Sequence, residues 1–348
     1  MPRQRQPQYR LRLDVPTRRI KYAGSKQTDG DIMDAHTARI TNRELHADAS
    51  DGLSQAPKGL SPKWFYDARG SEIFEEITQL AEYYPGRTER AILETHLPQI
   101  SAHVPEGAAL VELGSGASVK TRLLLDGLTQ LSAYVPIDIS EEFLHETAAD
   151  LAADYPSLDV EPVVADFMQA ITLPDLGGRP VVGFFPGSTI GNLDPDAAQA
   201  LLARLADWSD HDVLVLGVDL VKAPETLVAA YDDARGVTAR FNLNLLTRLN
   251  REAGADFDLE TFRHRAIWNA VESRVEMHLE SLQDQEVDLG GHRVSFAAGE
   301  TIHTENSHKY SVPGLSRLAS HAGWRIAEIL SDPDALFAVA ILQRDEGR

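Results

Sequence analysis

The chain reads Val111-Glu112-Leu113-Gly114-Ser115-Gly116-Ala117-Ser118 where an apolar run ends, and this stretch decides its fold class. The apolar residues predict a buried strand over 108–113, and residues 119–128 follow a helical pattern. A glycine turn between a strand and a helix lets the backbone approach a ligand closely, and the helix offers free N–H groups. The stretch therefore predicts a binding site for a nucleotide-like ligand.

Acidic residues around this turn narrow the choice of ligand. Asp138 follows the second predicted strand, 133–137, and Asp166 follows the third, 160–164. A carboxylate after the second strand suits the hydroxyls of a ribose. Because Glu112 precedes the glycines and no third glycine follows them, S-adenosylmethionine is favoured over a dinucleotide. The alternative interpretation is that each aspartate only caps its own loop.

Composition excludes several classes of protein. A net charge of −20 disfavours nucleic acid and anionic membrane surfaces as main partners. The chain has no cysteine, which excludes disulfides, a thiolate nucleophile and zinc–cysteine sites. No apolar run is long enough to span a membrane and no signal core follows the N-terminus, so we expect a cytoplasmic protein. Residues 1–32 are rich in Arg and Gln without hydrophobic periodicity, which predicts a disordered tail or a basic arm for an acidic partner.

Apolar strands alternate with helical patterns through the middle of the chain, with further strands at 181–185 and 213–218. Such alternation predicts parallel strands joined by crossover helices, in a doubly wound α/β sheet. Ligands bind such sheets at the carboxyl ends of the strands. Four candidate positions fall there: Gly114, Asp138, Asp166 and Asn192. Before the sheet, Pro85 is expected to end a helix over 71–80, and Thr88 to cap another over 89–100.

The alternation breaks after Lys222. Helices are predicted over 224–234 and 240–253, followed by β-type runs within 263–280 and 294–310. A helix over 313–322 and strands at 324–329 and 336–342 then restore the α/β pattern with an antiparallel edge. The pattern predicts an inserted lobe of helices and antiparallel strands.

Residues 301–310 carry an unusual density of polar side chains. If they form a strand, alternation places His303, Glu305, Ser307 and Lys309 on one face. Glu305 and Ser307 together suit a ring that carries both N–H and N. The alternative is a solvated polar edge strand.

A metal site made of His303, Glu305 and His308 is a third interpretation of this strand. It fails on geometry, because His308 would lie on the opposite face. We therefore expect no metal.

Asn192 closes the segment 188–192, which follows the fourth predicted strand. Its amide offers a donor and an acceptor for an amine or a carboxylate, although asparagine after glycine is also a common turn residue. Tyr66, Tyr83 and Tyr231 lie in segments whose first explanation is packing, but a tyrosine hydroxyl can also orient a substrate.

Several longer strings make the chain similar to the histidine-specific methyltransferase family. These are Lys63-Trp64-Phe65-Tyr66-Asp67, Glu82-Tyr83-Tyr84-Pro85, Glu112-Leu113-Gly114-Ser115-Gly116, Phe185-Pro186-Gly187-Ser188-Thr189-Ile190-Gly191-Asn192, Gly217-Val218-Asp219-Leu220-Val221-Lys222, Ala230-Tyr231-Asp232-Asp233 with Phe241-Asn242, and Thr304-Glu305-Asn306-Ser307-His308-Lys309. The resemblance runs from about Ser61 to the C-terminus in the same order.

The resemblance implies a Rossmann-like, mostly parallel methyltransferase sheet with an inserted α+β substrate-binding lobe. It implies transfer of methyl groups from S-adenosylmethionine to the α-amino group of L-histidine, giving the trimethylated product hercynine for ergothioneine biosynthesis. We expect a monomer. The positions implied for S-adenosylmethionine are Gly114, Lys120, Asp138, Asp166 and Phe167. The positions implied for histidine are Tyr83, Asn192, Tyr231, Met277, Glu305 and Ser307, with Tyr66 and Asn192 nearest the reacting amine.

Asn306 and His308 depart from the family pattern, which has apolar or small residues there. By alternation both point away from the pocket, so we expect little effect on specificity. Three other functions stay open: the same chemistry on another amino acid or small amine, a nicotinamide-dependent oxidoreductase, and a non-catalytic binding module. The missing third glycine disfavours the oxidoreductase.

These patterns divide the chain into three parts. Residues 1–34 are the basic tail. Residues 35–88 and 221–309 form the substrate-binding lobe, and residues 89–220 and 310–348 form the methyltransferase core.

Overall fold

A computed structural model describes residues 40–116, 119–208 and 213–345. The predicted tail, residues 1–34, lies outside this range. Within the described residues, no helix is both long and apolar enough to cross a membrane.

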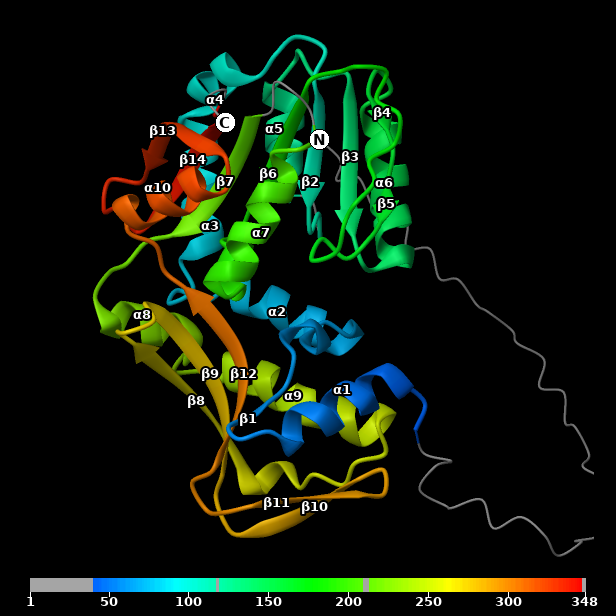
Figure 1. Ribbon diagram of the computed structural model, residues 1–348, viewed down its shortest axis with the longest axis vertical. Coiled ribbons are helices and arrows are strands. Elements are labelled where there is room, and N and C mark those ends of the chain that lie inside the picture. The colour runs from blue at the N-terminus through cyan, green and yellow to red at the C-terminus, as the bar shows by residue number, and fades with distance from the viewer. Residues whose placement is uncertain (1–39, 117–118, 209–212, 346–348) are drawn as a thin grey trace, which may run out of the picture.

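The described residues contain an eight-stranded sheet, which fills the upper half of Figure 1. Its order is β13-β14-β7-β6-β2-β3-β4, with β5 also paired to β3. The strands from β7 to β5 are parallel, while β14 pairs antiparallel with both β7 and β13. This arrangement confirms the doubly wound sheet and its antiparallel edge. The strands are β2 (Ala109–Leu113), β3 (Ala133–Asp138), β4 (Asp159–Val160), β5 (Val163–Val164), β6 (Val181–Phe185), β7 (Val213–Asp219), β13 (Trp324–Ser331) and β14 (Phe337–Arg344).

The prediction of one continuous strand over 160–164 is wrong. The segment forms two short strands, β4 and β5, which pair with different parts of β3. Pro162 lies between them and has no N–H to donate to a neighbouring strand. The carboxyl end of β5 still leads directly to Asp166, so the position of that residue at the sheet edge is unchanged.

Helices cover both faces of this sheet (Figure 1). The helix predicted over 89–100 is wrong in its bounds, because Pro85 occupies the first turn of α3, where its missing N–H costs nothing. A second helix, α4, then starts at Leu97. The helices of this half are α3 (Pro85–Thr95), α4 (Leu97–His103), α5 (Val119–Gly127), α6 (Glu141–Asp154), α7 (Pro195–Leu205) and α10 (Val312–His321), with the short 3-10 helix η3 (Thr189–Asn192) after β6.

The lower half of Figure 1 contains a four-stranded sheet with the order β1-β12-β9-β8, and a hairpin of β10 and β11. Its apolar residues form a core of their own with helices α1, α2 and α9. The sequence patterns missed α1 and β1, because they started the compact region at Ser61. The elements are α1 (Arg43–Ser54), β1 (Lys58–Gly59), η2 (Pro62–Phe65), α2 (Ala68–Thr78), α8 (Pro224–Tyr231), α9 (Val237–Glu252), η4 (Leu259–Thr261), β8 (Phe262–Asn269), β9 (Arg274–Ser281), β10 (Gln285–Leu289), β11 (His292–Phe296) and β12 (Thr301–His308).

The two halves are joined where β7 ends and β12 ends. The N–H of Tyr310 donates to the carbonyl of Asp219 at 2.9 Å, and the N–H of Val221 donates to the carbonyl of Tyr310 at 3.0 Å. These bonds bring the last residues of β12 to the carboxyl edge of the eight-stranded sheet. The end of β12, which carries predicted substrate residues, therefore lies at the same edge of the sheet as the predicted cofactor residues.

Candidate functional site

The glycine turn lies where the strand order of the sheet changes direction. The chain moves from β2 to β3 on one side and returns to β6 on the other, and the loops after β2 and β6 flank this switch point. Gly114 and Gly116 have φ angles of 67° and 46°, which side chains with a Cβ rarely adopt. Phe167 lies beside the turn, 3.8 Å from the place where a Cβ on Gly114 would be. The turn thus places exposed backbone and the ring of Phe167 at the carboxyl edge of the sheet, where ligands bind in sheets of this type.

Asp138 and Asp166 do cap their loops, as the alternative interpretation predicted. An oxygen of Asp138 accepts from the N–H of Ser140 at 2.9 Å, and an oxygen of Asp166 accepts from the N–H of Met168 at 2.8 Å. The other oxygen of Asp138 lies 3.5 Å from the N–H of Gly116. Among the described residues, these caps use only part of the acceptor capacity of each carboxylate, so capping and ligand binding are compatible.

Lys120 and Glu112, both near the glycines, have partners within the protein. The Lys120 ammonium lies 2.6 Å from the buried carboxylate of Glu89, which also accepts from the N–H of Gly187 in the loop after β6. The carboxyl of Glu112 accepts from the hydroxyls of Thr121 and Tyr134, and burial raises its pKa to about 7. These side chains tie the strands and helices around the turn together.

A β-bulge changes which residues of β12 face the substrate side. His303 pairs with His278 on β9, whereas Glu305 pairs with Met277, so the register shifts between them. Because His278 and Met277 are neighbours on β9 and point to opposite faces, His303 and Glu305 do so as well. Ser307 stays on the face of Glu305. The prediction that His303 shares this face is therefore wrong.

Glu305 is joined to the loop after β6 by a close approach of backbones. A Cβ on Gly191 would lie 2.7 Å from the carbonyl oxygen of His308, so only glycine lets η3 touch β12 here. The side chain of Asn192 also donates a hydrogen bond to the carboxylate of Glu305. The structure thus brings together two of the predicted site residues that are 113 positions apart in the sequence.

The ionisation of Glu305 is shifted by its surroundings. Burial raises the pKa of its carboxyl to about 7, although the charge of Lys309 and a hydrogen bond from Asn192 oppose the rise. A carboxyl with this pKa exchanges its proton near neutral pH. It can accept an N–H as a carboxylate or donate as an acid, which suits an imidazole partner.

Ser307 belongs to a buried polar network that sequence reasoning missed. Its hydroxyl lies 2.7 Å from the hydroxyl of Tyr231, and the ammonium of Lys309 donates to both, at 2.7 Å and 2.9 Å. Lys309 also pairs with the carboxylate of Asp219 at 2.8 Å, and the hydroxyl of Tyr84 donates to the same carboxylate at 2.9 Å. The only sequence signal for Lys309 was its place on the alternating face. Its partner Asp219 could not be found without the fold.

The charge of Glu305 acts on two of the three candidate tyrosines, and the third, Tyr231, contacts Ser307. Packing around the phenol, and then the charge of Glu305, raise the pKa of Tyr66. Burial raises the pKa of Tyr83 well above its usual value, with Tyr231, Tyr66 and Glu305 adding to it. The rings of Tyr83 and Tyr231 lie edge to face, with centroids 6.4 Å apart. Tyr66 exposes 45% of its surface, so it lies at the rim of this group.

Apolar side chains complete the walls. Met277 is buried opposite Glu305. Phe74 and Phe241 pack against the ring of Tyr66, with centroids 5.6 Å and 5.8 Å away. A polar group enclosed by thioether and aromatic surface is weakly solvated, so its hydrogen bonds become more selective.

Asn306 and His308 point away from Glu305, as predicted. The Asn306 amide lies 3.4 Å from the carboxylate of Asp194, and the His308 ring lies 3.9 Å from the same carboxylate. Both residues therefore contact the helix that follows η3 rather than the polar network around Ser307.

These features define the chain as an α/β protein with a candidate small-ligand site between a glycine turn and a polar β-strand. Residues 45–344 match the model of a family described as histidine-specific methyltransferases that depend on S-adenosylmethionine, and the chain belongs to that family. The family match begins in α1, earlier than the resemblance from Ser61 indicated.

Named relatives agree with this assignment. The chain is 45% identical to a histidine N-alpha-methyltransferase of Mycolicibacterium smegmatis, over 86% of this chain and 95% of the relative. It is 44% identical to the enzyme of the same name from Mycobacterium tuberculosis, over 80% of this chain and 88% of the relative. It is 30% identical to ergothioneine biosynthesis protein 1 of Neurospora crassa, over 85% of this chain but only 34% of that longer protein.

Proposed function

We propose that this protein transfers methyl groups from S-adenosylmethionine to the α-amino group of L-histidine, giving Nα,Nα,Nα-trimethylhistidine for ergothioneine biosynthesis. The observation that carries the proposal is the pairing of Glu305 and Ser307 on one face of β12, where Asn192 bonds to Glu305 and Tyr231 bonds to Ser307. The names of the mycobacterial and fungal relatives support the same substrate and pathway.

In this proposal the two ends of histidine are held by different elements. Glu305 accepts the imidazole N–H and Ser307 contacts the second ring nitrogen, both from β12. Asn192, Tyr83 and Tyr231 hold the amino and carboxylate groups, and Met277 packs against the ring. A carboxylate that loses its N–H partner would be left buried and unpaired, so amino acids without an imidazole bind poorly.

S-adenosylmethionine, when bound, supplies an electrophilic methyl carbon on its sulfonium. Gly114, Asp138, Asp166 and Phe167 fit a nucleoside at the switch point, with Lys120 holding the neighbouring loop through Glu89. The positive φ of Gly114 and the unused acceptor capacity of the two carboxylates support this fit.

The protein's main task is then placement of the α-amine in line with the methyl carbon. As the N–C bond forms, the C–S bond breaks and its electrons stay on the sulfur. Tyr66 and Asn192 orient the lone pair of the amine, and the weakly solvated site favours its neutral form. The amine proton leaves to water. The faces of Tyr66 and Tyr83 accommodate the growing positive charge of the methylated ammonium.

One assay tests this proposal: purified protein with L-histidine and isotope-labelled S-adenosylmethionine, followed by mass spectrometry of the product. We expect labelled mono-, di- and trimethylhistidine to appear in turn. A panel of other amino acids and small amines tests the alternative substrate class. Faster methylation of any of them than of histidine would contradict the proposal. Cytoplasmic location and a monomeric state stay predictions, which cell fractionation and light scattering can check.

A further inference from the structure

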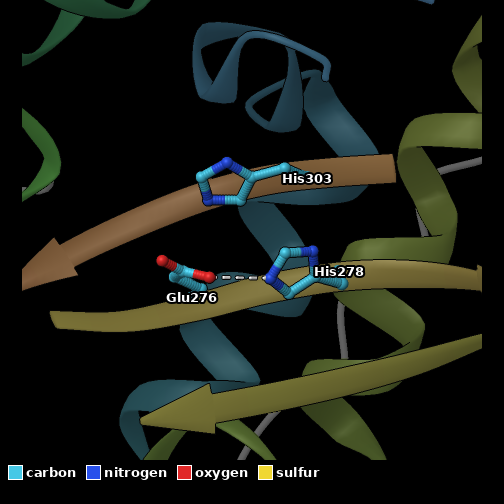
Figure 2. Close-up of side chains that lie close together, drawn as sticks. All are labelled: Glu276, His278 and His303. Carbon is cyan, nitrogen blue, oxygen red and sulfur yellow. Dashed lines mark hydrogen bonds and ion pairs between the residues drawn. The ribbon is translucent and has the colours of Figure 1, made fainter. Parts of the chain in front are cut away.

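The other face of the four-stranded sheet carries three side chains that the site above does not use. Glu276 and His278 lie two residues apart on β9 and share a face. The β-bulge in β12 turns His303 onto that same face, directly opposite His278. Figure 2 shows the carboxylate and the two imidazole rings on one side of the two strands. We call Glu276, His278 and His303 the outer-face cluster.

The three side chains of the outer-face cluster are close enough together to be a candidate metal site. One oxygen of Glu276 and one ring nitrogen of each histidine all lie within 4.8 Å of one another. Oε2 of Glu276 is 3.1 Å from Nε2 of His278, and the rings of His278 and His303 stack with centroids 4.9 Å apart. Zinc binds oxygen and nitrogen ligands at about 2.0–2.2 Å, so small side-chain rotations would enclose one ion. Two imidazoles and a carboxylate are also a common ligand set for this metal.

Neighbouring residues hold the carboxylate of Glu276 in a fixed orientation. Oε1 of Glu276 accepts from Asn269 at 2.9 Å and from Arg274 at 2.8 Å, which leaves Oε2 facing the histidines. Oε2 is thus the oxygen of Glu276 that lies beside the two imidazoles.

The outer-face cluster is open to a charged pocket. His303 lines the same pocket of about 360 Å³ as Asp48, Asp51 and Asp194. Asp48 and Asp51 bring negative charge to this opening, whereas the guanidinium of Arg274, 3.8 Å from the carboxylate of Asp194, offsets the charge of the third carboxylate. Nε2 of His303 lies 3.1 Å from the backbone carbonyl of Glu305 on the same strand, and Asn192 and Glu305 also line this pocket.

We propose that Glu276, His278 and His303 bind a divalent transition-metal cation, with Zn²⁺ the first candidate, on the outer face of the lobe. The ion would link β9 to β12, whose opposite faces carry Met277 and Glu305, and so would stiffen the substrate wall. It takes no part in methyl transfer. This proposal departs from the sequence prediction of no metal, which tested His303 only with residues of its own strand. The bulge and the pairing of β9 with β12 supply different partners.

The experiment uses full-length protein without an affinity tag, stripped with a chelator and dialysed. Titration with Zn²⁺ alone in a calorimeter should give one equivalent of binding. We expect His278→Ala, His303→Ala and Glu276→Gln each to weaken this binding at least about tenfold. His292→Ala is the matched control, because His292 is an exposed histidine on β11 of the same lobe and lies outside the cluster; it should bind Zn²⁺ as the wild type does.

A second measurement does not depend on how well the variants fold. Co²⁺ added to the stripped wild-type protein should give the strong visible absorption of a four- or five-coordinate site, and Zn²⁺ should displace it. Absence of that absorption, or Zn²⁺ binding that all three cluster variants retain in full, would overturn the proposal. Methylation of histidine by the stripped enzyme is measured in parallel, so that failure of the metal site and failure of the proposed function are told apart.

Discussion

The two halves of this molecule, the large sheet and the lobe, differ in which groups they offer to a ligand. At the carboxyl edge of the large sheet, where we propose that S-adenosylmethionine binds, Gly114 and Gly116 shape a turn with positive φ angles, and N–H groups of their own loops hold the carboxylates of Asp138 and Asp166. In the lobe, Ser307 at the end of β12 and Lys309 just after it belong to a buried network that reaches Asp219 in the other half, and Glu305 lies on the same face of β12 as Ser307. A turn held by its own backbone suits a ligand shared by many enzymes, whereas a network of side chains suits one particular substrate. The lobe should therefore respond more strongly to single substitutions.

The largest effect is expected for Glu305→Ala. Loss of the carboxylate leaves the imidazole N–H of histidine without an acceptor, so kcat/KM for histidine should fall by at least about a hundredfold. Calorimetry should find the Kd for S-adenosylmethionine unchanged. Asn306→Ala, on the same strand but facing away, is the control and should keep its turnover. Equal losses in both variants would mean that the strand, and not the carboxylate, matters.

The second-largest effect is expected for Lys309→Met, which should lower the free energy of unfolding. The ammonium is buried and pairs with Asp219, so its removal leaves that carboxylate with Lys222 as its remaining cation. Breaking buried ion pairs typically costs about 3–5 kcal/mol, and the second cation should keep the loss at or below about 3 kcal/mol. Urea denaturation measures it. A free energy of unfolding equal to that of the wild type would show that the network adds nothing to the fold.

The third prediction, Asp138→Ala, tests the proposed cofactor site in the other half of the molecule. We expect the Kd for S-adenosylmethionine to rise about tenfold, as for the loss of one hydrogen bond to a charged group. The KM for histidine, measured at saturating cofactor, should change little. Asp175→Ala is a matched control, because Asp175 caps its own loop through the N–H of Gly177 but lies away from the glycine turn. A larger effect from the control would contradict the assignment.

The smallest effect is a pH dependence of stability. The folded pKa of Glu305, about 7, lies above its usual value, so the folded state holds this proton more tightly than the unfolded chain. The resulting stability is present at low pH and is lost as the pH rises through about 7. Glu305→Gln cannot titrate. Its melting temperature relative to the wild type should therefore rise by a few degrees between pH 5 and pH 8, in a thermal melt at each pH. A constant difference would show that Glu305 is not buried as described.

Much of the fold could be read from local patterns. Strands β2, β3, β6 and β7 are apolar runs bounded by turns, and their order along the chain fixes a parallel sheet. Two predicted element bounds were wrong because a single proline overrode the hydrophobic pattern around it. Pro162 split one strand, and Pro85 began a helix that it was expected to precede. In both places the absence of an N–H mattered more than the hydrophobicity of the neighbours.

The sequence by itself determined the chemistry that is carried within a few residues: the glycine turn, the carboxylates after the strands, and Glu305 with Ser307 at a spacing of two. These follow from local geometry, because strand alternation and turn conformation are set by adjacent residues. Only the tertiary structure decided which face His303 occupies, that Lys309 meets Asp219, and that Gly191 lets Asn192 approach β12. A bulge, a buried ion pair and a close backbone contact each depend on a partner far away in the chain, and no local pattern records that partner.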